Sequence, residues 1–437
     1  MTNTTDMESL AQPRAQRSPR IRNSQETTGA HGAAARRGPR RAGERPGGGA
    51  GGALGTNANL RATGGMALRV ERFALQSVAR EILPKTRTAL CLRARIKGSE
   101  GVSVWKSDHH GTAHYGGLQT CGSVWSCPIC AAKITERRRI EVQDAMGQHR
   151  AAGGAVQLLT LTTPHTRADV LADLIAKQST ALQSFLRDRA VKTVFREMGY
   201  LGQIRAWEIT HGRRGTGNGW HPHFHFLQFV TVTANAAQLM DWKTRLYLRW
   251  DACCQRAGLG SPSFAHGIDL QDGRKADRYI SKWGLEDELT RGHTKKGRAG
   301  GETPFDLLRS VLADGEDRQG AALFREFSEC FRGKRQLSWS NGLKACFCQA
   351  ETTDEEIANQ QEDTAQLLGM LTVQQWRDVL KVKARATVLE LAAAGGWSSV
   401  SRFLWFIEGA AEGVQFDAPM LAEARALLLH ESPPPGA

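Results

Sequence analysis

One run of alternating histidines and large apolar residues constrains this chain most: Trp220-His221-Pro222-His223-Phe224-His225-Phe226-Leu227. Side chains alternate between the two faces of a β-strand with a period of two. We therefore expect His223 and His225 on one face of a strand that continues through Val230, with Phe224 on the opposite face in a core. Two imidazoles held on one face of a strand form half of a divalent metal site.

The positive charge is concentrated in the part of the chain that holds this motif. The 437 residues suffice for two or three domains, and the net charge is +14. Residues 1–65 carry +6, residues 66–350 carry +15 and residues 351–437 carry −7. This distribution indicates a polyanionic partner and favours nucleic acid as the substrate.

Membrane insertion and secretion are not expected. No apolar run approaches the ~20 residues that span a bilayer, and the N-terminus lacks the apolar core of a signal peptide. We expect a cytoplasmic protein with no membrane partner. Its nine cysteines are then reduced thiols, some of them metal ligands.

Composition and periodicity predict four segments. Residues 1–65, rich in Gly, Ala and Arg, are expected to be disordered. Residues 66–150 form a basic, cysteine-containing segment, 151–350 the core with the motifs, and 351–437 an acidic linker and helical accessory region. The expected strands are 156–163, 202–210 and 223–230. The expected helices are 134–148, 167–198, 236–257, 274–289, most of 303–350, 365–394, 398–411 and 419–430.

Glu208, on the second of these strands, offers a hard anionic oxygen. Together with His223 and His225 it would suit Mn²⁺ or Mg²⁺ and leave open positions for phosphate oxygens. The alternative is a surface carboxylate at a strand end. His221 is less determined because Pro222 interrupts the simple alternation, so it is either a group behind the ligands or a DNA contact.

Tyr279 and Lys282 share one face of the expected helix because they lie three residues apart. A tyrosine hydroxyl has an ordinary pKa of ~10 and is a poor nucleophile, but a nearby ammonium or metal ion favours the phenolate. Metal, tyrosine and lysine together suit a transesterification in which the tyrosine attacks a DNA phosphate. The alternative is a buried tyrosine and a solvated lysine.

Three cysteines within ten residues, Cys121, Cys127 and Cys130, indicate a tetrahedral Zn²⁺ site that needs one more ligand. The candidates for the fourth ligand are Cys91, His109 and His114. We favour Cys91 because thiolate is the softer ligand. Buried free thiols are the alternative.

Basic and aromatic residues near these motifs are candidates for DNA contact. The cysteine site would hold the basic run Arg137, Arg138 and Arg139 in place. Trp283, next to Lys282, could stack on an exposed base. Trp207, Trp242 and Trp250 are expected in the core.

The order of the motifs resembles that of bacterial plasmid rolling-circle replication initiators of the HUH endonuclease superfamily, especially the single-tyrosine Rep proteins. The segments that carry the resemblance are Thr160-Leu161-Thr162-Thr163-Pro164, Glu208-Ile209-Thr210, His221 through Leu227, and Tyr279-Ile280-Ser281-Lys282. The cysteine segment and residues 303–308 and 337–344 are similar to one branch, in which a cysteine at position 91 is common. The resemblance covers about residues 85–345.

The resemblance implies an α+β fold: an antiparallel HUH endonuclease sheet with flanking helices, preceded by a zinc knuckle and followed by a small helical region. It implies that the protein binds plasmid origin DNA, single-stranded or as a hairpin, and nicks one strand in a bacterial cytoplasm. Tyr279 would take the 5′-phosphate and release a 3′-hydroxyl primer, with Lys282 positioning the phosphate. A host helicase and a second copy of the chain are further candidate partners.

The sequence departs from some relatives at the step that ends replication. Those relatives place a catalytic carboxylate four residues before the tyrosine, where this chain has Lys275. Asp277 and Glu286 are nearby alternatives.

Three other functions compete with the initiator. A relaxase usually has its tyrosine before the histidine motif, whereas Tyr279 follows it. Many HUH transposases use two tyrosines one helical turn apart, but positions 275 and 283 are Lys and Trp. A catalytically silent DNA-binding regulator would not need the full set of His, Glu, Tyr and Lys.

Overall fold

The computed structural model describes residues 62–214, 217–273, 301–360, 364–409 and 423. Residues 1–61 of the extension expected to be disordered over 1–65 lie outside the described residues, as does the helix expected at 274–289. So do the expected helix at 419–430, apart from Glu423, and the end of the one expected at 398–411. Residues 62–65 belong to the helix α1 (Ala62–Ile82).

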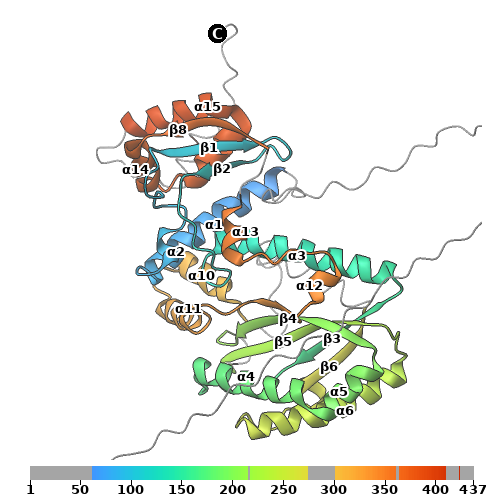
Figure 1. Cartoon of the computed structure of the whole chain (residues 1–437). Helices are drawn as coiled ribbons and strands as arrows, with labels where there is room; N and C mark the ends of the chain where they lie inside the picture. Colours follow the sequence, from blue (N-terminus) through green and yellow to red (C-terminus); the bar gives the residue numbers. More distant parts are fainter. Residues whose placement is uncertain (1–61, 215–216, 274–300, 361–363, 410–422, 424–437) are drawn as a thin grey trace, which may run out of the picture. The chain divides into compact units, whose positions relative to one another are not determined.

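The described elements follow one another along the chain as helices and strands in alternating groups (Figure 1). The helices are α1 (Ala62–Ile82), α2 (Arg87–Leu90), α3 (Pro128–Ala151), α4 (Leu171–Arg187), α5 (Arg189–Glu197), α6 (Ala236–Arg256), α7 (Phe264–Gly267), α10 (Pro304–Ala313), α11 (Arg318–Cys330), α12 (Leu343–Cys346), α13 (Asp354–Asn359), α14 (Val373–Lys381) and α15 (Arg385–Gly409). The strands are β1 (Val102–Ser107), β2 (Ala113–Gly116), β3 (Ala155–Leu161), β4 (Tyr200–His211), β5 (Trp220–Val230), β6 (Ile268–Asp272), β7 (Leu337–Trp339) and β8 (Ala365–Leu371).

The larger sheet has five strands in the order β6-β3-β5-β4-β7, and every neighbouring pair is antiparallel. The histidine strand β5 is central, between β3 and β4. The predicted α+β class, with an antiparallel sheet and flanking helices, is confirmed. The expected strands at 156–163, 202–210 and 223–230 correspond to β3, β4 and β5.

The two faces of this sheet carry different layers (Figure 1). On one face, Phe224 and Phe226 of β5 share a core with buried residues of α4, α5 and α6, among them Phe185 and Trp250. On the other, Leu227 and residues of α3 and α12 form a second core. This core covers only the part of the face near Leu227, so the histidine end of β5 is left for other groups.

A second sheet, in the order β2-β1-β8, joins distant parts of the chain. Ser103 of β1 pairs with Met370 of β8, and α14 and α15 pack against this sheet in a core of their own. Residues 102–116 and 365–371 therefore share one sheet, although the sequence division put them in different segments.

The prediction of a helix over 365–394 is wrong at its start, because residues 365–371 form the strand β8. The apolar run Leu367-Leu368-Gly369-Met370-Leu371 suits either state, and pairing with β1 decides it. A Cβ on Gly369 would lie 2.3 Å from the Trp397 ring, so this position takes only glycine without rearrangement.

The remaining differences concern short elements. Most of 303–350 was expected to be helical, but residues 337–339 form the edge strand β7. Strands β1, β2 and β6 were not predicted either. None of the helices in the described ranges is both long enough and apolar enough to cross a membrane.

Candidate metal centres

The β4–β5 register brings the predicted ligands together. Glu208 lies directly opposite His223, and Ala206 lies opposite His225. The alternation puts Glu208, His223 and His225 on one face, while Trp207 and Phe224 point into the core on the other. The small side chain of Ala206 leaves the space beside His225 open to the carboxylate.

The distances within this group fit one metal ion. The Oε2 atom of Glu208 lies 3.3 Å from His223 Nε2 and 3.4 Å from His225 Nε2. One ligand atom from each of the three residues lies within 4.8 Å of the others. Adjacent ligands of an octahedral ion with bonds of 2.0–2.1 Å are about 3.0 Å apart, so the three atoms can occupy adjacent positions of Mg²⁺ or Mn²⁺.

Neighbouring groups orient both imidazoles. His223 Nδ1 lies 3.3 Å from the carbonyl of His221, which can only accept, so Nδ1 donates. His225 Nδ1 lies 2.9 Å from Thr160 Oγ1, across the β3–β5 ladder. With the proton on Nδ1, each Nε2 keeps its lone pair for a metal. The sequence had flagged Thr160 only as part of a motif.

The carboxylate is held in its ionised form. Burial opposes ionisation of Glu208, but protonated His225 and His223 rings, which donate to it from Nε2, outweigh burial and hold the pKa of this carboxyl well below its usual range; a bound cation would take their place. An anionic oxygen is the form that a hard divalent cation binds.

His221 lies beside the ligands rather than among them. Its ring is 4.9 Å from that of His223 and 4.5 Å from that of His165, with the two Nδ1 atoms of His221 and His165 3.3 Å apart. Burial, followed by the neighbouring imidazoles, lowers the pKa of His221 to about 3, so it is neutral near pH 7. His165 is a member of this group that the sequence reasoning missed.

Pro222 does not interrupt the alternation, contrary to the sequence interpretation. β3 ends at Leu161, opposite Phe224, so no β3 residue lies opposite Pro222. The missing N–H of Pro222 therefore costs no hydrogen bond between these two strands. Its carbonyl accepts from the buried Gln178 amide at 2.7 Å. In the sequence, only the position of Gln178 among the apolar residues of a helix indicates this contact, because a buried amide needs a hydrogen-bond partner.

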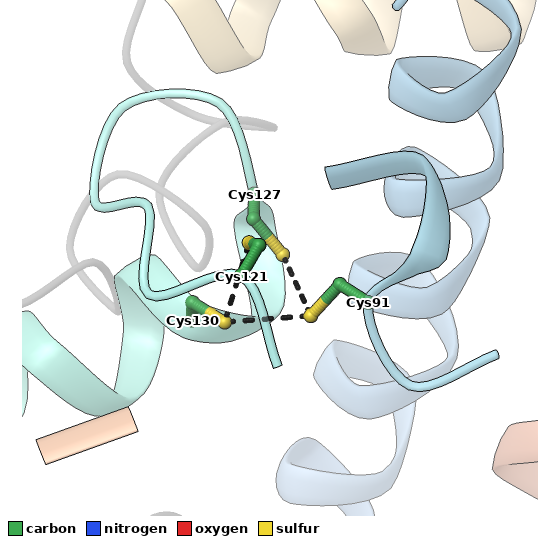
Figure 2. Close-up of side chains that lie close together, drawn as sticks. All are labelled: Cys91, Cys121, Cys127 and Cys130. Atoms are coloured by element: carbon green, nitrogen blue, oxygen red, sulfur yellow. Dashed lines mark hydrogen bonds between the residues drawn. The ribbon is translucent and has the colours of Figure 1, made fainter. Parts of the chain in front are cut away.

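Four cysteines form the second centre. The sulfurs of Cys91, Cys121, Cys127 and Cys130 point toward one another (Figure 2). Three of the sulfur pairs are 3.5, 3.6 and 3.6 Å apart. A tetrahedral Zn²⁺ with bonds of about 2.3 Å has sulfur–sulfur edges of about 3.8 Å, so the group fits zinc. Neither His109 nor His114, the other candidates, is part of it.

The surrounding chain sets up this centre locally. Cys91 follows α2, while Cys127 caps the N-terminus of α3 and Cys130 lies in its first turn. The N-terminus of a 24-residue helix favours thiolates. The neighbouring Cys127 and Cys130 thiols hold the pKa of Cys121 far below its ordinary value, whereas the Cys121 thiol raises the pKa of Cys91 and burial raises the pKa of Cys127. The buried Gln76 amide donates to the Cys91 carbonyl at 3.1 Å and fixes the end of α2.

The basic run after the cysteines is less free than its sequence suggests. Arg138 is 13% exposed and binds Glu141 at 2.9 Å and Asp354 at 3.0 Å. Arg139 pairs with Glu136. Arg137 contacts Glu141 at 3.5 Å but stays more open, at 36% exposed. Much of the positive charge of this run is therefore compensated within the chain.

Several predicted site residues lie outside the described residues: Tyr279, Lys282, Trp283, Asp277 and Glu286.

The tryptophans that the sequence predicts in the core are buried. Trp207, Trp242 and Trp250 are each at most 5% exposed.

The part of the chain that holds the three-residue centre and three of the four cysteines is similar to a known family. Residues 117–238 match the family described as replication protein. This region contains Cys121, Cys127, Cys130 and all three residues of the Glu208 group. The resemblance to replication initiator proteins that the motifs suggested is confirmed; the HUH superfamily and the single-tyrosine type are not tested by this match.

Two curated proteins from Streptomyces are similar to the chain. One is "Protein rep" of Streptomyces lividans, 29% identical over 300 residues, which cover 54% of this chain and 65% of the relative. The other is "Neomycin resistance protein" of Streptomyces cyanogenus, 28% identical over 234 residues, which cover 43% and 52%. The chain thus spans less than two thirds of either relative. No solved structure matches significantly.

Proposed function

We propose that this protein initiates rolling-circle replication of a plasmid by nicking one strand at the origin, with a metal ion at Glu208, His223 and His225. The observation that carries the proposal is the convergence of these three side chains, 3.3–3.4 Å apart, on the face of a central strand. The similarity of residues 117–238 to replication proteins supports the same role.

When bound, the metal would supply positive charge to the phosphate that is attacked. The chain would hold that metal through the two Nε2 atoms and the Glu208 carboxylate. Thr160 and the His221 carbonyl would keep the imidazoles in the ligating tautomer, and the neutral His221 would add no competing charge.

Tyr279 is the proposed nucleophile, and Lys282 its positioning partner. The chain has four tyrosines. The hydroxyls of the three in the described residues are engaged elsewhere: Tyr115 with the Arg385 carbonyl, Tyr200 with Ser340 and Tyr247 with the Pro262 carbonyl. Tyr279 follows Asp272 by seven residues, which span at most about 25 Å, and β6 belongs to the sheet that carries the metal group. This elimination supports Tyr279.

In the proposed reaction the Tyr279 oxygen attacks the phosphorus, and the bond to the 3′-oxygen breaks. The 5′-phosphate becomes joined to the tyrosine, and the leaving oxygen takes up a proton as the 3′-hydroxyl that primes synthesis. Asp277 or Glu286 would activate the step that ends replication.

The test is a covalent adduct between the protein and a single-stranded oligonucleotide that carries the plasmid's origin, with Mn²⁺, on a denaturing gel. We expect an adduct that disappears with chelator and with Tyr279→Phe but persists in the matched variant Tyr247→Phe. No adduct from folded wild-type protein that binds this DNA would replace the proposal with a DNA-binding regulator.

A further inference from the structure

A cavity of about 1090 Å³ lies away from the Glu208 group, beside the cysteine centre. One wall is the loop Cys121–Ser126, and another is the turn 332–335 between α11 and β7. Strand β7, residues 351–355 and parts of the segments 83–88 and 340–344 also line it. None of the three candidate metal ligands on β4 and β5 lines it.

The lining carries an excess of positive charge. Its basic residues are Lys85, Arg87, Arg138, Arg332, Lys334, Arg335 and Lys344. Its acidic residues are Glu351, Asp354 and Glu355. Two of the basic residues are compensated internally, because Arg138 binds Asp354 and Lys344 lies 3.3 Å from the buried Glu141.

The remaining cations face the cavity with little compensation. Lys85, Arg332 and Arg335 are exposed, and they form no ion pair within the described parts of the chain. Arg87, 65% exposed, lies 3.8 Å from Glu355 and donates to the Thr120 carbonyl at 3.3 Å. Uncompensated guanidinium and ammonium groups around a hollow are suited to phosphate groups.

The basic turn is fixed in place. The indole N–H of Trp125, from the cysteine loop, donates to the Lys334 carbonyl at 2.6 Å. The Trp125 ring packs on Phe331 at 4.6 Å, and Phe331 packs on Trp207 at 5.1 Å. These contacts hold the turn 332–335 against the cysteine loop and strand β4.

The turn 332–335 on the cavity wall also connects with strand β4, which carries Glu208. The backbone N–H of Trp207 donates to the Gln336 carbonyl at 3.0 Å, so the residues just before β7 run beside the part of β4 that holds Trp207 and Glu208. Arg335 precedes Gln336 directly. A strand bound along the turn would therefore continue toward the face with the metal ligands.

We propose that this cavity binds the sugar-phosphate backbone of a single DNA strand on its way to the metal group, an inference that rests on the proposed function. A positively charged groove that follows the backbone is the usual means by which proteins bind a single strand. Lys85, Arg332 and Arg335 contact its phosphates.

The test measures the affinity of the full chain for a fluorescent oligothymidine of about 20 nucleotides over a range of salt concentrations. We expect the triple variant Lys85→Gln, Arg332→Gln, Arg335→Gln to bind roughly tenfold to a hundredfold more weakly. Its salt slope falls by about 2, or ~0.7 for each lost single-strand phosphate contact. All three side chains are exposed, so the variant should fold.

The matched control removes the same charge from α4 and α5 through Lys177→Gln, Arg189→Gln and Lys192→Gln, all exposed. Equal losses in the two variants, or no loss in the first, would overturn the cavity as the binding site. Wild-type adduct formation is scored separately. Without an adduct the nicking function fails, but the comparison of the two variants still decides whether the cavity binds DNA.

Discussion

At the scale of single residues, the first prediction concerns Thr160, which touches a proposed ligand but not the metal. Thr160→Val keeps the shape and removes the 2.9 Å hydrogen bond to His225 Nδ1. Partners that orient ligating histidines typically contribute 10–100-fold in metal affinity, so we expect a loss of roughly that size. Titration with Mn²⁺ followed by calorimetry measures it.

Two further variants make the Thr160 result specific. Thr160→Ser should restore most of the affinity because it restores the hydroxyl. Thr180→Val, which removes a hydroxyl on α4 that donates to the Ala176 carbonyl, should change nothing. Unchanged Mn²⁺ affinity in Thr160→Val would show that this bond does not orient the ligand.

The sequence predicted site residues that depend on a pattern within one strand, and it missed those that depend on how distant segments pack together. His223 and His225 share a face because strand alternation operates within three residues. Thr160 and Gln178 act through the register of another strand and the docking of a helix, which no local pattern encodes. Cys91 lies 30 residues before Cys121, and only ligand chemistry distinguished it from the nearby histidines.

At the scale of elements, a buried ion pair ties the β4–β5 turn to α11, and Asp317→Asn tests it. The 5% exposed Arg213 guanidinium binds Asp317 at 2.7 Å and Glu302 at 2.7 Å. Asparagine still caps α11, so the substitution mainly removes the charge. Glu302 still compensates Arg213 in this variant, so the loss is that of the charge-assisted hydrogen bonds to Asp317. We expect it to be about 2 kcal/mol at pH 7, measured by urea unfolding.

The pH dependence of this pair has a definite sign. The Arg213 hydrogen bonds hold the pKa of Asp317 below its ordinary value. The stabilisation is therefore complete above the unfolded-state pKa of about 3.9, and it is lost as the pH falls through the lower folded-state pKa. The wild-type advantage should narrow below about pH 4. A difference between wild type and Asp317→Asn that stays constant at all pH values would contradict the assignment.

Helices and strands were predicted correctly where the apolar periodicity extends over many residues. They were missed where pairing with a strand far away in the sequence determines the secondary structure. The helix α6 and the strands β3, β4 and β5 carry clear patterns. Strand β8 was expected to be helical because its partner β1 lies more than 250 residues away in the sequence, and the short edge strand β7 exists through its pairing with β4.

At the scale of the whole molecule, the charge pattern and the cavity agree. The basic excess predicted for residues 66–350 includes Lys85, Arg332 and Arg335 on the cavity lining. The acidic segment 351–437 contributes Asp354 and Glu355, which compensate Arg138 and Arg87. A helicase or a second copy of the chain as partner remains a prediction. Truncation at residue 350 cannot test dimerisation cleanly because it removes β8 from the smaller sheet.

The cysteine centre joins segments far apart in the sequence, so its loss should lower the stability of the fold and not only that of the cysteine loop. Cys91 follows α2, the other three cysteines frame the start of α3, and all four belong to the core that also holds Phe224 of β5. We expect Cys91→Ser to lose the bound Zn²⁺ and to melt several degrees lower, because metal binding to such a site contributes directly to folding. Metal analysis and thermal unfolding measure both effects. Cys348→Ser, at an exposed cysteine outside the group, should keep the metal and the melting temperature. Wild-type protein that is fully stable after complete metal removal would show instead that the four thiols act only as buried apolar side chains.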